Sequence, residues 1–149
     1  MTQLDEIKFQ NAESIKQCQS YLSALSNSEL STSMPAGWTV SSVLVHLIFW
    51  DQRALTLLEK WKKEGIEFSA IDTEVINEVT RPICLAVPPR TAVGLFFETA
   101  EKLNITIANL ESAWVEEILE KGKNVILNRA IHRLKHLEEI KIVLKKPNG

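Results

Sequence analysis

The length, composition and charge of this chain predict a single globular domain over residues 1–149. Apolar residues make up 45% of it, charged residues 24%, and the net charge is −2, so no basic face favours a nucleic-acid partner. No apolar run approaches the ~18 residues that span a bilayer, and we therefore expect no association with membranes.

Two long helices are predicted in the first half of the chain. Apolar residues recur at helical spacing over residues 4–25, and the Ser-rich stretch 23–33 is interpreted as a linker. A second helix is predicted over residues 40–63, with Thr39 as its N-cap and Gly65 as its stop. Because its first half is apolar nearly all round, it is expected either to be central or to meet another subunit.

The second half of the chain predicts two more long helices. Asp72 is expected to cap a shorter helix that Pro82 ends or bends. The pair Pro88-Pro89 then begins a helix that runs to residue 110, and a connection follows up to Gly122. The last helix is predicted over residues 124–145. This order predicts an all-α fold, a four-helix bundle with a short extra helix between its second and third helices.

Three histidines fall at positions where they could share one metal ion. His132 and His136 are four residues apart on the last helix, so both imidazoles leave the same face. His46 lies in the apolar part of the second helix, and a third imidazole from there would complete a three-His site. Three protein ligands leave one coordination position open, which is the arrangement that a catalytic metal needs.

Four further residues are candidates for the surroundings of that site. Arg129 and Glu139 lie one helical turn from the His pair, and Arg53 lies on the face of His46, so each could orient a ligand or a bound substrate. Trp50 is a candidate wall of the pocket, although packing is the simpler interpretation of this ring. Asp51, which follows Trp50, is interpreted as marking the solvent edge of the helix.

Simpler interpretations of the histidines stay open on spacing alone. A single His in an apolar helix is often a core residue with one hydrogen bond, and a pair four apart is often a solvated face. Arg133 follows His132, so the pair is not the H-E-x-x-H pattern of metalloproteases. Cys18 and Cys84 form no C-x-x-C motif and are interpreted as reduced thiols. Together with an acidic N-terminus that does not resemble a signal peptide, they predict a cytoplasmic location.

Three segments resemble the DinB/YfiT-like superfamily. Residues 37–47, Gly-Trp-Thr-Val-Ser-Ser-Val-Leu-Val-His-Leu, followed by Trp50, are similar to its second-helix signature. The pair His132-x-x-x-His136 resembles its C-terminal helix, and residues 71–86 are similar to its variable crossing region. The resemblance implies a four-helix bundle in which His46, His132 and His136 bind zinc or nickel, with water in the open position.

The resemblance also implies a range of activities. Some relatives are transferases or isomerases that use the thiols bacillithiol or mycothiol, and others look like hydrolases. We therefore expect a metal-dependent hydrolase or thiol-dependent transferase that acts on a small molecule, with a low-molecular-weight thiol as a candidate partner. The alternative is a non-catalytic bundle protein of the stress response that binds a metal or another ligand. A homodimer is predicted separately, because Val45 and Phe49 project away from the face of His46.

Overall fold

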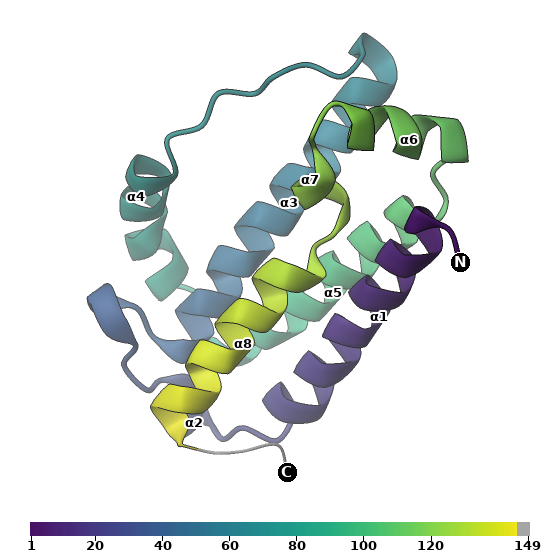
Figure 1. Cartoon of the computed structure of the whole chain (residues 1–149). Helices are drawn as coiled ribbons and strands as arrows, with labels where there is room; N and C mark the ends of the chain where they lie inside the picture. The colour runs from purple at the N-terminus through teal and green to yellow at the C-terminus, as the bar shows by residue number, and fades with distance from the viewer. Residues whose placement is uncertain (146–149) are drawn as a thin grey trace.

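The computed structural model describes residues 1–145, and every regular element within them is a helix. The four longest are α1 (Gln3–Leu22), α3 (Val40–Glu64), α5 (Pro89–Ala108) and α8 (Ala130–Leu144). Helix α1 contacts α5 and α8, and α3 contacts the same two helices, so the four enclose a shared interior (Figure 1). The predicted all-α bundle is confirmed.

Helix α3 begins at the predicted residue and ends one residue later than predicted, at Glu64 before Gly65. The backbone N–H of Ser42 donates to Thr39 Oγ1 at 3.2 Å, and the N–H of Thr39 donates to Ser42 Oγ at 2.7 Å. These reciprocal bonds satisfy two donors that a helix start leaves unpaired. At the other end Gly65 has a φ of +89°, a conformation that favours glycine, and its N–H donates to the carbonyl of Trp61 at 2.8 Å.

The connections hold more helix than the sequence predicts. Within the Ser-rich stretch, helix α2 (Asn27–Leu30) forms because Ser26 and Glu29 cap each other's backbone N–H groups. The stretch before Gly122 holds α6 (Ser112–Glu120), whose Val115 and Ile118 are buried. The extra helix α4 (Thr73–Leu85) is capped by Asp72 as predicted. It continues through Pro82 to Leu85, so the expectation that Pro82 could end it was wrong.

The predicted last helix is broken near its start. It consists of α7 (Asn124–Leu127) and α8, separated by Asn128 and Arg129. The side chain of Asn11, from α1, takes the place of the lost helical bonds. Its amide nitrogen donates to the carbonyl of Leu127 at 2.8 Å, and its oxygen accepts from the N–H groups of Arg129 and Ala130 at 2.8 and 3.2 Å. The interruption is therefore satisfied by a residue from the opposite end of the chain.

The buried apolar residues form two clusters with a polar layer between them. One cluster contains Leu22, Leu47 and Leu137, and the other contains Ile7, Leu55 and Leu127. On each long helix, buried or half-buried polar residues lie close to where one cluster ends and the other begins. These are Asn11 and Ser14 on α1, Asp51 on α3, Asn104 on α5 and Arg133 on α8.

Helix α3 is central in this arrangement, which accounts for its apolar circumference. It contacts α5 and α8 on one side and α4 on another (Figure 1). Val45 and Phe49 are half-buried, so the homodimer stays a prediction. Among residues 1–145, no helix is both long enough and apolar enough to cross a bilayer. The predicted single domain includes residues 146–149, which lie outside the described residues.

Candidate metal centre

The three histidines converge at one point between α3 and α8. The Nε2 atoms of His46 and His132 lie 3.3 Å apart, and those of His132 and His136 lie 3.1 Å apart. One nitrogen from each ring lies within 4.8 Å of the other two. Zinc–imidazole bonds of about 2.0–2.1 Å in tetrahedral geometry place ligand nitrogens ~3.3 Å apart. The two short separations match that value, so these side chains fit a divalent metal ion.

The helical scaffold accounts for this convergence. Because His132 and His136 are one turn apart on α8, their ring centroids lie only 4.8 Å apart. His46 approaches them from α3. Its ring makes a T-shaped contact with the ring of Trp38, and the two centroids lie 5.5 Å apart. The ring of Trp50 lies 6.3 Å from His46 on the same helix. Two aromatic side chains therefore restrict the rotation of His46.

Burial keeps the imidazoles neutral. Desolvation, with smaller contributions from His136 and Lys135, lowers the pKa of His46 to about 4. Desolvation also lowers the pKa of His132 to about 3, with His136 and Arg129 adding to the effect. The pKa of His136 is lowered by burial, although Glu139 opposes the shift. At neutral pH the three rings are therefore unprotonated and have lone pairs available for a metal ion.

These depressed pKa values predict that the metal-free protein loses stability as the pH falls. Unfolded histidines take up protons near pH 6.5, whereas His46 and His132 stay neutral in the folded protein down to about pH 4 and 3. Between these values the unfolded chain binds more protons, so the free energy of unfolding decreases by about 1.4 kcal/mol per pH unit for each histidine. Urea unfolding of metal-free protein between pH 6.5 and 5 measures this slope. His132→Gln should reduce it, and an equal slope in this variant would contradict the assignment.

Glu139 and Arg129 contact the outer nitrogens of the His pair. Glu139 Oε2 lies 3.1 Å from Nδ1 of His136, a distance at which Nδ1–H donates to the carboxylate and Nε2 keeps its lone pair. A carboxylate is the usual partner of a metal-binding histidine. Nη2 of Arg129 lies 3.5 Å from Nδ1 of His132, too far for a strong hydrogen bond. Arg129 therefore brings a positive charge beside His132 without fixing the position of its proton.

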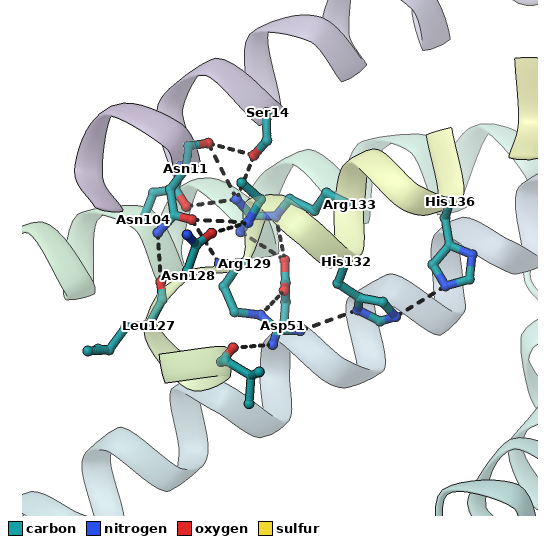
Figure 2. A network of polar contacts seen from close by, with 12 residues as sticks. Asn11, Ser14, Asp51, Asn104, Leu127, Asn128, Arg129, His132, Arg133 and His136 are labelled. Atoms are coloured by element: carbon teal, nitrogen blue, oxygen red, sulfur yellow. Dashed lines mark hydrogen bonds and ion pairs between the residues drawn. The ribbon is translucent and has the colours of Figure 1, made fainter. Parts of the chain in front are cut away.

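Asp51 and two arginines form a buried ion network directly behind the histidines. Asp51 Oδ1 accepts from Arg129 Nε at 2.9 Å, and Oδ2 accepts from Nε and Nη2 of Arg133 at 3.1 and 2.9 Å. Figure 2 shows this carboxylate between the two guanidiniums, with His132 next to Arg129. Asp51 is only 1% exposed, so its interpretation as the solvent edge of the helix was wrong.

Arg133 was not predicted as part of the site, yet it is fully buried beneath it. Besides Asp51, its guanidinium donates to Asn104 Oδ1 at 3.0 Å and to Ser14 Oγ at 3.2 Å. One side chain thus connects α8 with α1, α3 and α5 (Figure 2). The sequence did hold a signal: Arg129 and Arg133 are one turn apart in a predicted helix that also carries apolar positions at Ala130, Leu137 and Ile140, so two buried arginines would require an acidic partner.

The histidines form one wall of a cavity of about 730 Å³. Of the four residues predicted around the metal, Trp50, Arg129 and Glu139 line this cavity, whereas Arg53 does not. The guanidinium of Arg53 instead lies over the ring of Trp50, 5.9 Å from its centroid. Burial and the charge of Arg129 lower the pKa of Arg53. The other lining residues, besides the three histidines, are Met34, Pro35, Trp38, Val43, Thr73, Asn77, Lys135, Ile142 and Val143.

Comparison of the chain with protein-family models, with curated proteins and with solved structures finds no match. The resemblance to the DinB/YfiT-like superfamily therefore stays a prediction. Any statement about function rests on the chemistry of the three histidines and the cavity beside them.

Proposed function

We propose that the protein is a metal-dependent enzyme in which His46, His132 and His136 hold a divalent transition metal. The observation that supports this most directly is the spacing of the histidine nitrogens, 3.1 and 3.3 Å, at the wall of a cavity. Neutral imidazole nitrogens suit zinc and nickel, which are the candidate ions. A solvent-exposed histidine has a pKa near 6.5. Burial lowers the pKa of His46 and His132 well below this value, so these rings are neutral at physiological pH.

The proposed reaction is hydrolysis or thiol transfer on a small molecule. A bound ion would act as a Lewis acid and lower the pKa of a water or thiol in its open coordination position. The chain's own residues would bind and orient the substrate. Glu139 holds the ring of His136, Arg129 offers a positive charge beside His132, and the tryptophan rings exclude water from one wall. The cavity volume lies within the range of small-molecule sites.

Metal content and turnover test this proposal together. Protein purified without a His-tag is expected to contain about one zinc or nickel ion per chain, measured by elemental analysis. It should turn over either an activated aryl ester or a thiol with an aryl halide as electrophile. Removing the metal with a chelator should abolish that activity, and adding zinc or nickel should restore it.

Each outcome of this experiment has a distinct meaning. Failure to take up either ion at micromolar concentration would contradict the metal site itself. Uptake of one ion without turnover of either substrate class would favour the non-catalytic alternative, a bundle that binds a metal or another ligand. Turnover that is unchanged by the chelator would show that the activity comes from other residues or from a contaminant.

A further inference from the structure

The ion network behind the cavity carries more positive than negative charge. Asp51 is the one carboxylate that pairs with Arg129 and Arg133 in the described residues, so one positive charge stays uncompensated. Two other charged side chains line the cavity, Lys135 and Glu139, and they balance each other. The cavity wall therefore has a net positive charge next to a region of low polarity. A bound anion would supply the missing negative charge.

Arg129 lines the cavity, and hydrogen bonds fix the orientation of its positively charged guanidinium. Its Nε donates to Asp51 and its Nη1 donates to the carbonyl of Val125 at 2.7 Å, so two strong bonds fix the guanidinium plane. Its Nη2 has only the long contact of 3.5 Å with His132 among the residues described. A guanidinium has five N–H donors, so Arg129, which lines the cavity, keeps further donors for a ligand. An arginine whose orientation is already fixed loses little entropy when it binds an anion.

Helix α4 offers the cavity an acceptor that has no partner among residues 1–145. In the part of the chain that the structure describes, the side-chain oxygen of Asn77 is buried without a hydrogen-bond partner, and Asn77 lines the cavity from α4. A buried acceptor left unpaired is costly, so a ligand that donates a hydrogen bond there would be favoured. The lining of the cavity is otherwise largely apolar and includes Trp38, Val43 and Val143.

We propose that the cavity binds a small organic anion that has an apolar body and a hydrogen-bond donor. Its anionic group binds Arg129 and Lys135, and its donor binds the side-chain oxygen of Asn77. This inference rests on the proposed function in that it takes the cavity beside the histidines as the substrate site. It adds the chemical class of the substrate, which the three histidines do not specify.

Three related probes test this class on the metal-free protein. Phenylacetate is an anion, 2-phenylacetamide is its neutral counterpart, and mandelate adds one hydroxyl donor to phenylacetate. Calorimetry and quenching of tryptophan fluorescence measure binding, since Trp38 and Trp50 line the cavity. We expect phenylacetate to bind at least about tenfold tighter than the amide, because a bond to a charged group is the stronger one. Mandelate should bind still tighter, by about three- to tenfold.

Matched variants assign the effects to residues. Arg129→Met should remove the preference for phenylacetate over the amide, and Asp51 keeps Arg133 as its partner in this variant. Lys135→Gln replaces an exposed side chain and should weaken the preference without affecting folding. Asn77→Leu should remove the advantage of mandelate over phenylacetate. Lys141→Gln lies on the same helix but outside the cavity lining, and it should change neither preference.

The results separate this inference from the proposed function. Equal affinity of the wild-type protein for phenylacetate and the amide would overturn the inference, as would a preference that survives both Arg129→Met and Lys135→Gln. Equal affinity for mandelate and phenylacetate would overturn the role of Asn77. Because the protein is free of metal, a preference for the anion supports the inference even if elemental analysis finds no bound ion. Conversely, metal-dependent turnover without a preference for the anion would support the proposed function and contradict the inference about the substrate class.

Discussion

Replacing His132 by alanine is expected to lower the affinity for zinc by more than about 100-fold. His132 is the middle ligand of the candidate site, since its Nε2 lies 3.3 Å from that of His46 and 3.1 Å from that of His136. Loss of a group that only orients a ligand already costs about 10- to 100-fold in affinity, and loss of the ligand itself costs more. Competition against a chromophoric chelator measures the change.

Two variants on α8 make this result specific. Glu139→Gln keeps all three histidines but weakens the contact to Nδ1 of His136, so an intermediate loss of about tenfold or more is expected. Glu138→Gln changes an exposed neighbour and should leave the affinity unaltered. If His132→Ala keeps the wild-type affinity while its circular dichroism stays helical, the metal is bound elsewhere and the candidate site is wrong.

Replacing Asp51 by alanine is expected to reduce the free energy of unfolding by about 3–5 kcal/mol. The change leaves two guanidiniums buried together without a counter-charge, and Arg133 is fully buried. Such a loss is a large part of the ~5–15 kcal/mol that stabilises a typical domain. Urea unfolding followed by circular dichroism at neutral pH measures it.

Controls distinguish this buried network from ion pairs at the surface. Glu78→Gln breaks an exposed pair with Arg81, and little or no loss of stability is expected, because water screens such pairs. Asp51→Asn removes the charge but keeps an oxygen acceptor, so it should fall between the two and provides a measurable protein if Asp51→Ala does not fold. Equal losses for Asp51→Ala and Glu78→Gln would mean that water or an ion compensates the arginines.

The parts of the fold that depend on neighbouring residues were predictable from the sequence. Apolar spacing predicts the long helices, and Thr39 and Gly65 predict where α3 begins and ends, because a cap or a stop acts within a few residues. The spacing of His132 and His136 likewise fixes their common face before any tertiary contact is known. The meeting of His46 with this pair needed the additional assumption that two apolar helix faces pack together.

The parts that depend on distant residues were not predictable. Asp51, which follows Trp50, was interpreted as the solvent edge of the helix, yet its partners lie 78 and 82 residues further along the chain. The break between α7 and α8 is equally invisible locally, because residues 124–127 continue a helical pattern. It is stabilised by Asn11, which contacts Leu127 across 116 residues. Polar contacts between residues so far apart produce no periodic pattern in the sequence.

The hydrogen bonds between Asn11 and the break that separates α7 from α8 have a consequence for biosynthesis. The ribosome makes Asn11 116 to 119 residues before the backbone groups that it binds, at Leu127, Arg129 and Ala130. Until then α1 has no α8 to dock on, and the polar atoms of its inner face stay hydrated. Closing a loop of this length is a slow step in folding. The candidate metal site needs His132 and His136 on α8, so it is expected to be completed only after α8 has been made, and shorter nascent chains would carry His46 alone.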